Sequence, residues 1–191
     1  MRIATLLGSP RKKGNTATVL GLFEQLVAQD HEVDRMDIAF QNVKGCLGCY
    51  ECQAVTDEPG CVQDDDAVSL FGRLIRSDAV VYATPLYCWC FPAQMKALID
   101  RSLCLATGYG SKKHKSLMEG KKLALLVTCD GPVEDNADFI QGVFDRVCGF
   151  LKGVVVGKYI VPSCTTPGAV IDTGTAVARQ MAKDIVGAPL G

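Results

Sequence analysis

Four cysteines in one short segment form the sharpest chemical pattern of this 191-residue chain. Cys46, Cys49 and Cys52 follow one another with two residues between each pair, and Cys61 closes the segment. Thiolate sulfur binds iron and zinc, and this close spacing gathers successive sulfur atoms around one centre. The segment also contains glycines, which let a backbone wrap tightly. The pattern therefore predicts an iron–sulfur cluster or a zinc site, with a set of free thiols as the alternative that needs no metal.

A glycine-containing turn after the first apolar run predicts a phosphate site. It extends from Gly8 to Thr16 and leads into an amphipathic helical pattern. The N–H groups at a helix N-terminus bind anions, and an asparagine at that place is a common cap. The turn lacks the glycine patterns of dinucleotide and P-loop sites, so we expect one phosphate monoester, with a plain strand-to-helix turn as the alternative. The candidate ligands are its hydroxyl, amide and basic side chains: Ser9, Arg11, Lys13, Asn15 and Thr16.

Apolar runs alternate with helical patterns along the chain. The expected strands cover residues 2–7, 31–38, 79–83, 123–128 and 154–160, and the expected helices cover residues 16–28, 66–76, 91–105, 135–150 and 171–185. About five strand–helix units predict an α/β fold with a buried parallel sheet. With no internal repeat or linker, we expect residues 1–191 to form a single domain, in which the irregular, cysteine-rich stretch at about 40–65 is functional.

Composition excludes several classes of protein. Twenty basic and 21 acidic side chains leave a net charge of −1, so no general field attracts nucleic acid or anionic lipid. No apolar run approaches the roughly 20 residues of a membrane span, and a strand at residue 2 leaves no room for a signal peptide. We expect a cytoplasmic protein. The basic run at 112–115 is interpreted as a solvated loop, and neither histidine belongs to a catalytic motif, so no side-chain acid or base is expected.

Two motifs in the same order resemble those of a known family. The run from Gly8 to Arg11, with Gly14 to Thr16, resembles the FMN-phosphate loop of the NADPH-dependent FMN reductases, and the run from Thr84 to Arg101 resembles their turn and helix after the third strand. The resemblance implies a flavodoxin-like three-layer α/β sandwich with a five-stranded parallel sheet in the order 2-1-3-4-5. It also implies that Ser9, Arg11, Asn15 and Thr16 hold the FMN phosphate.

The same resemblance supplies contacts for the flavin ring. The turn after the third strand lies along the isoalloxazine in these relatives, which assigns Pro85, Leu86, Tyr87, Cys88 and Trp89 to the ring. A loop after the fourth strand resembles the one that approaches the other edge of the flavin, which adds Thr128, Asp130 and Gly131. Cys129 suits a small buried position equally well, and the remaining cysteines, Cys88 among them, are most simply core or wall residues.

The cysteine segment resembles that of the iron–sulfur flavoproteins of this family. Those proteins carry a close-packed cysteine motif followed by acidic residues, like 64–66 here. The resemblance favours a 4Fe-4S cluster on Cys46, Cys49, Cys52 and Cys61, which would exchange electrons with FMN. The last spacing is slightly longer than the family pattern.

These observations predict an FMN-dependent oxidoreductase. It would accept a hydride from NAD(P)H, or electrons from a protein donor, and reduce a flavin, quinone or other acceptor, which is a small molecule or a protein. The resemblance further implies a homo-oligomer, either a dimer or a tetramer. One alternative is a non-enzymatic electron carrier of the flavodoxin or iron–sulfur flavoprotein type, although flavodoxins of that type are strongly acidic. The other is a zinc-stabilised interaction module without flavin.

Overall fold

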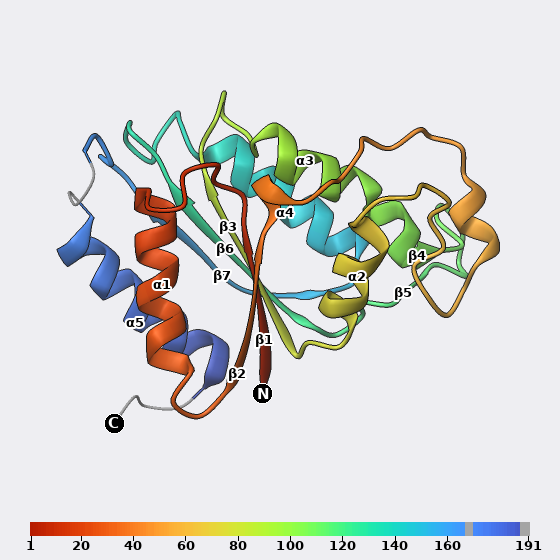
Figure 1. The fold of residues 1–191 in the computed structure, drawn as a ribbon, viewed down its shortest axis with the longest axis horizontal. Helices are drawn as coiled ribbons and strands as arrows, with labels where there is room; N and C mark the ends of the chain where they lie inside the picture. Colours follow the sequence, from red (N-terminus) through yellow and green to blue (C-terminus); the bar gives the residue numbers. More distant parts are fainter. Residues whose placement is uncertain (167–169, 188–191) are drawn as a thin grey trace.

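A computed structural model describes residues 1–166 and 170–187. A parallel sheet of five strands forms its centre, in the order β2-β1-β3-β6-β7 (Figure 1). These strands are β1 (Arg2–Leu7), β2 (Glu32–Asp37), β3 (Ala79–Pro85), β6 (Lys122–Thr128) and β7 (Val154–Val161). Counted among these five alone, the order is 2-1-3-4-5, so the predicted sheet is confirmed.

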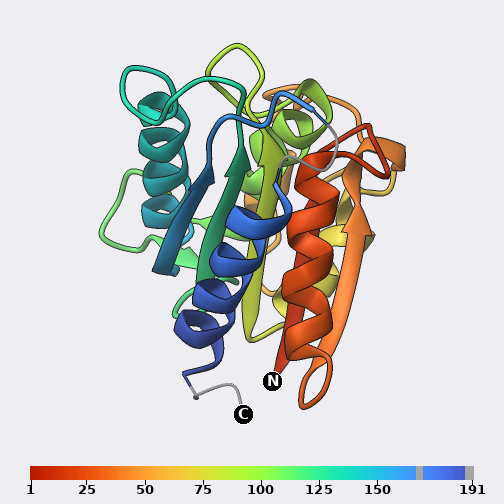
Figure 2. The same ribbon diagram turned by 90° about the vertical axis from the view of Figure 1, so that its left-hand side faces the viewer.

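Helices cover both faces of the sheet, and the predicted three-layer sandwich is confirmed (Figure 2). One face carries α1 (Asn15–Val27) and α5 (Ile171–Val186), and the other carries α2 (Ala67–Ile75), α3 (Ala93–Asp100) and α4 (Asp138–Phe150). Each helix presents an apolar stripe to the strands, which buries that surface away from water. The loop that connects β1 to α1 lies at one end of the sheet, where β1 ends and α1 begins.

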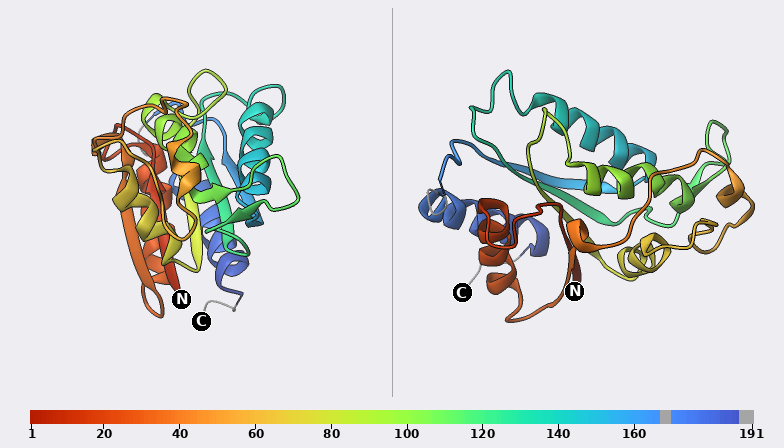
Figure 3. Two further views of the ribbon diagram at one scale, coloured as in Figure 1. Left: turned by 90° about the vertical axis from the view of Figure 1, so that its right-hand side faces the viewer. Right: turned by 45° about the horizontal axis from the view of Figure 1, so that its top comes forward.

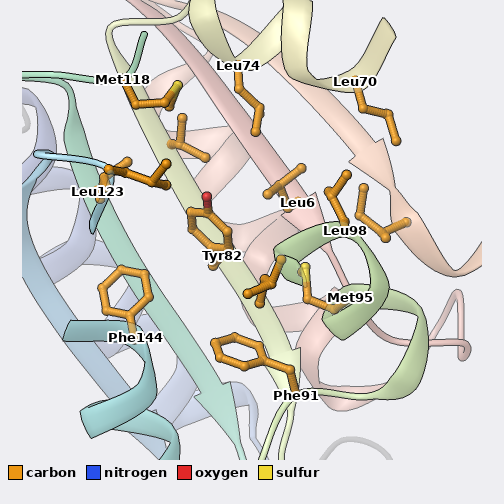
Figure 4. Close-up of a cluster of buried hydrophobic side chains, with 14 of the residues drawn as sticks. Leu6, Leu70, Leu74, Tyr82, Phe91, Met95, Leu98, Met118, Leu123 and Phe144 are labelled. Atoms are coloured by element: carbon orange, nitrogen blue, oxygen red, sulfur yellow. The ribbon is translucent and has the colours of Figure 1, made fainter. Parts of the chain in front are cut away.

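Alternating side chains of the central strands form two cores. Leu6 and Tyr82 belong to the core under α2, α3 and α4, whereas Leu7 and Val81 belong to the core under α1 and α5. In the first core the ring of Tyr82 packs edge to face on that of Phe144, with 5.6 Å between the ring centroids (Figure 4). This dense packing fixes the strand ends from which the loops emerge.

Three short features differ from the sequence-based expectation. The helix expected over 91–105 is α-helical only to Asp100 and continues as a 3-10 segment, η3 (Arg101–Leu105). After it, β4 (Ala106–Thr107) and β5 (Lys115–Ser116) form a small antiparallel pair. The stretch at 40–65 is irregular, as predicted, apart from η1 (Ile38–Phe40), which reaches its first residue, and η2 (Glu51–Ala54). Elements of two to five residues are too short to produce a hydrophobic period.

The segment that carries η2 projects beyond the side of the sheet, next to β4 and β5 (Figure 3). Lys112 and Lys113, in the connection between β4 and β5, are exposed, in agreement with a solvated loop. Among residues 1–166 and 170–187, no helix has the length and apolar character needed to cross a membrane.

Candidate functional site: a pocket at the strand ends and a cysteine-rich segment

The loop between β1 and α1 is held by backbone and hydroxyl contacts. Gly8 N donates to Ala83 O of β3 over 2.8 Å, and Arg11 N donates to the buried Ser9 Oγ over 3.1 Å. The helix α1 then begins after Gly14 with no side-chain cap and no acidic residue in its first turn. Since the first N–H groups of a helix have no intrahelical acceptor, α1 offers these donors and its positive dipole end to an anion.

A pocket of about 170 Å³ opens in front of this helix end. It lies at the carboxyl ends of the central strands, where open parallel sheets bind their ligands. Its lining consists of Ser9, Arg11, Gly14, Asn15, Thr16, Pro85, Leu86, Tyr87, Thr128, Cys129, Asp130 and Cys164. Gly14 permits the tight approach of the loop, because a Cβ atom there would lie 3.0 Å from Arg11 Cβ. Hydroxyls, an arginine and a bare helix N-terminus together suit a phosphate group.

Asn15 has a different contact from the one expected. Instead of capping α1, its Nδ2 donates to Cys164 O over 3.0 Å, because Asn15 is already the first helical residue and Gly14 is the cap. The cap prediction for Asn15 is therefore wrong. The contact fastens the segment after β7 to the start of α1, so that Asn15 shapes the pocket wall.

The turn after β3 has an unusual backbone. Tyr87 and Cys90 exchange two backbone hydrogen bonds of 3.0 Å, and the two residues between them, Cys88 and Trp89, have φ values of 46° and 61°. Positive φ at both central residues is typical of turns that favour asparagine and glycine. Here the strained turn carries two aromatic side chains into solvent, with Tyr87 42% and Trp89 56% exposed. Exposed aromatic rings beside a polar pocket suit contact with a planar ring.

The floor of the pocket contains two cysteines. Cys129 N donates to Val161 O over 3.0 Å, and Cys164 N donates to Cys129 O over 2.9 Å. Burial raises the pKa of both thiols, and the neighbouring Asp130 adds to this effect. Both cysteines therefore stay protonated near neutral pH and serve as uncharged wall residues.

Nine of the predicted contacts line the pocket: Ser9, Arg11, Asn15, Thr16, Pro85, Leu86, Tyr87, Thr128 and Asp130. Lys13 lines an adjoining cavity of about 220 Å³ together with Arg11 and Cys164. Cys88, Trp89 and Gly131 line neither cavity. Cys88 is also exposed, so its interpretation as a core or wall residue is wrong.

Gly14, Cys129 and Cys164 line the pocket but were absent from the sequence-based site. The sequence could have indicated the two cysteines, because each follows a predicted strand. The carboxyl ends of parallel strands lie at the edge of the sheet where the other pocket residues were expected.

The cysteine-rich segment is only half anchored. Cys46 and Cys49 are exposed, whereas Cys52 is buried and Cys61 is partly buried. Within the described parts of the chain, no three His, Cys, Asp or Glu side chains are grouped so that they could hold a metal ion. The donor set fits an iron–sulfur cluster in its chemistry, since four thiols are what such a cluster requires, but the structure does not gather them.

Two contacts anchor the middle of this segment. Gln53 Nε2 donates to Leu103 O over 3.1 Å and to Ala106 O over 2.9 Å, which joins η2 to η3. At Gly60 the segment folds back on itself so closely that a Cβ atom would meet Cys52 O at 3.2 Å and collide with the Val55 side chain. Glycine is therefore required at this position.

A further thiol lies next to the anchored half. Cys104 of η3 is 3% exposed, and burial, with Cys61 and Cys52 nearby, raises its pKa to about 12. Cys104 is buried, as expected for a core or wall residue. Its proximity to Cys52 and Cys61 was not predicted from the sequence. That proximity depends on how η2 and η3 pack, which no spacing along the chain reveals.

Comparisons with known proteins agree with this arrangement. The family described as NADPH-dependent FMN reductase matches residues 1–165. An iron–sulfur flavoprotein of Archaeoglobus fulgidus is 34% identical over 97% of this chain and 79% of its own length. One of Methanosarcina thermophila is 34% identical over 60% of this chain and 59% of its own length.

Among solved structures, the NAD(P)H:quinone oxidoreductase of Methanothermobacter marburgensis shares the fold. Its TM-score is 0.73 at 22% identity, over 97% of this chain and 96% of that one. The family matches residues 1–165, and the A. fulgidus relative is 34% identical over nearly the whole chain. This chain therefore belongs to the NADPH-dependent FMN reductase family and is an oxidoreductase.

Proposed function

We propose that the chain binds FMN in the pocket at the strand ends and transfers electrons from NAD(P)H to an acceptor. The observation that carries this proposal is the bare N-terminus of α1, which faces a pocket with hydroxyl groups and Arg11 and has no acidic residue in its first turn. A phosphate monoester bound there would accept hydrogen bonds from the helix N–H groups, from Thr16 and Ser9, and from the Arg11 guanidinium.

The turn after β3 would then orient the flavin ring. Pro85 and Leu86 lie at the end of β3, and Leu86 N donates to Thr128 O over 2.9 Å, so the two ring loops are fastened to each other. Apolar side chains exclude water from the reacting face, and exposed backbone N–H groups stabilise a ring that gains negative charge. Bound FMN would supply hydride and electron transfer, which explains why no side-chain acid or base is needed here.

The acceptor is proposed to be a quinone or another flavin. Relatives such as the FMN-dependent NADH:quinone oxidoreductase 1 of Hahella chejuensis, 36% identical over 44% of this chain, carry that activity in their name. Tyr87 and Asp130 line the pocket and are both exposed to solvent, which suits a flat acceptor stacked on the ring. We also expect the protein to act in the cytoplasm as a homo-oligomer.

We further propose that Cys46, Cys49, Cys52 and Cys61 ligate a 4Fe-4S cluster. The name of the A. fulgidus relative and the donor set support this assignment. The cysteine segment contacts η3, after the C-terminus of α3, whereas the ring loop precedes the N-terminus of α3 (Figure 1). Eight helical residues span about 12 Å, and we propose that the cluster exchanges electrons with the flavin of the same or a neighbouring subunit.

Cofactor release and rapid mixing test the flavin assignment. Heated protein should release FMN, because the phosphate loop closes on one helix N-terminus and lacks the glycine pattern that accommodates a pyrophosphate; release of FAD would contradict the proposal. Anaerobic mixing with NADPH and with NADH should bleach the flavin within the turnover time. Flavin that keeps its colour with both would identify an electron carrier instead.

Anaerobic reconstitution tests the cluster. The parent should take up about four iron atoms and four sulfides per chain, and Cys49→Ser should lose most of that iron. Cys148→Ser is the matched control, because Cys148 lies on the buried face of α4 and is no candidate ligand. Less than about one iron per chain in the parent would exclude the cluster and leave the FMN assignment intact.

A further inference from the structure

A buried ion pair lies at the base of the cysteine-rich segment. Arg101 Nη1 donates to Asp65 Oδ2 over 2.7 Å, and Arg101 Nη2 donates to Asp65 Oδ1 over 3.1 Å. The two side chains are 1% and 0% exposed. A paired guanidinium and carboxylate in this geometry form a rigid, planar contact. Such a contact is costly to bury, which makes its position informative.

This pair joins both ends of the segment. Arg101 Nη1 also donates to Lys44 O over 3.0 Å, and the Asp65 carboxylate accepts Lys44 N at 2.9 Å and Ala67 N at 3.1 Å. Lys44 stands two residues before Cys46, and Asp65 stands four residues after Cys61. One side chain of η3 therefore holds the entrance and the exit of the segment together.

Arg101 retains a donor that the ion pair does not use. Its Nε is buried and has no hydrogen-bond partner among the described residues. Burial lowers the pKa of Arg101, but its hydrogen bond to Asp65 and its interactions with Cys61 raise that pKa above the ordinary value. The guanidinium is thus permanently charged and has one hydrogen-bond donor without a partner among the described residues.

We propose that Arg101 is a positioning residue for the metal centre, which clamps the two ends of the cysteine-rich segment and places a fixed positive charge at its base. The clamp follows from the contacts above, whereas the electrostatic part rests on the proposed cluster. Hydrogen bonds and positive charge near cluster sulfur favour the reduced form, so Arg101 should raise the reduction potential.

Hydrogen exchange of the FMN-loaded protein tests the clamp without a cluster. Arg101→Lys keeps a charge but loses the two-pronged contact, so amides of residues 44–66 should exchange about tenfold faster or more. The matched control is Arg73→Lys, which disrupts a partly buried ion pair between the last turn of α2 and Asp34 of β2. Exchange at 44–66 that is equal in the parent and both variants would overturn the clamp.

Redox titration of anaerobically reconstituted protein tests the charge. Arg101→Gln removes the positive charge and keeps Asp65, whose carboxylate still accepts Lys44 N and Ala67 N, so the net charge at the site changes by one unit. Its cluster should have a lower reduction potential than the parent, and Arg101→Lys should restore much of the difference. Equal potentials in all three proteins would overturn the electrostatic part. If the parent takes up no iron, both the electrostatic part and the proposed cluster are overturned. The hydrogen-exchange experiment would still test the clamp.

Discussion

The hydroxyl groups of Thr16 and Thr128 lie 2.6 Å apart, although 112 residues separate them in the sequence. Both residues are at most 4% exposed. Thr16 belongs to the first turn of α1 and Thr128 ends β6, so this hydrogen bond joins two walls of the pocket at the strand ends. The pocket therefore depends on a tertiary contact as well as on the loop that leads into α1.

Thr16→Ala should weaken FMN binding by about 1 kcal/mol, or roughly fivefold in Kd, since it removes one hydrogen bond and leaves Thr128 without its partner. Titration of the apoprotein with FMN, followed by flavin fluorescence, measures the change. Thr18→Ala is the control, because the Thr18 hydroxyl donates to Gly14 O and does not line the pocket. A larger loss of affinity in Thr18→Ala than in Thr16→Ala would contradict the assignment.

Asn15→Ala should also weaken FMN binding by about 1 kcal/mol, because it frees the segment after β7 from the start of α1. Asn15→Asp is the comparison, since it keeps the size of the side chain but loses the Nδ2 donor and adds a negative charge beside the phosphate. Its Kd should rise more than that of Asn15→Ala. If Asn15→Ala and Thr16→Ala both bind FMN like the parent, the phosphate loop is assigned wrongly.

Replacing Trp89 or Tyr87 with Leu should increase the fluorescence of bound flavin, because an aromatic ring in contact with the isoalloxazine quenches its emission. Steady-state emission at saturating FMN checks this. Tyr109→Leu serves as the control, as Tyr109 is 66% exposed in the connection between β4 and β5. Emission and turnover unchanged in both ring-loop variants would remove these residues from the site.

Cys88→Asn should stabilise the apoprotein by up to about 1 kcal/mol. Cys88 has a φ of 46° in a two-residue turn, and asparagine tolerates that conformation better than other side chains do. Urea unfolding monitored by circular dichroism gives the difference. Asparagine at an exposed position without a positive φ, as in Thr165→Asn, should not stabilise the apoprotein. A destabilised Cys88→Asn would show that the thiol makes contacts which outweigh the strain.

The Arg101–Asp65 pair should make stability fall in acid. Burial raises the pKa of Asp65, but the hydrogen bond from Arg101 and those from Lys44 N and Ala67 N outweigh this and lower it to about 2. A carboxyl whose pKa is lowered in the folded state stabilises the protein at pH values above 3.8, the ordinary pKa of an aspartate. This contribution, about 2 to 3 kcal/mol, is lost as the pH falls toward 2.

Unfolding free energies measured between pH 5 and pH 2 should show this loss in the parent. Asp65→Asn should be less stable at pH 5 and should lose less on acidification, whereas Asp57→Asn, at an exposed position outside any helix or strand, should follow the parent. A parent curve that is flat through this window would contradict the shifted pKa.

Much of the fold could be predicted from local patterns. Apolar runs of five to eight residues and helical periods give the five central strands and the five helices within a few residues, because each must bury one face. Nine predicted residues line the pocket: the chemistry of the loop before the first helix indicated Ser9, Arg11, Asn15 and Thr16, and the family resemblance supplied Pro85, Leu86, Tyr87, Thr128 and Asp130. The strand order itself came from the resemblance of two motifs to a family, since periodicity does not specify which strands are neighbours.

Tertiary structure alone decided the contacts between distant segments. Nothing near Asn15 in the sequence indicates that its amide reaches Cys164, and nothing near Arg101 indicates Asp65 as its partner. The exposed Cys46 and the buried Cys52 belong to one motif, yet only the packing of η2 on η3 separates them. Spacing along a chain determines which residue types recur together, but burial and partner choice depend on how separate elements pack, which is a property of the whole fold.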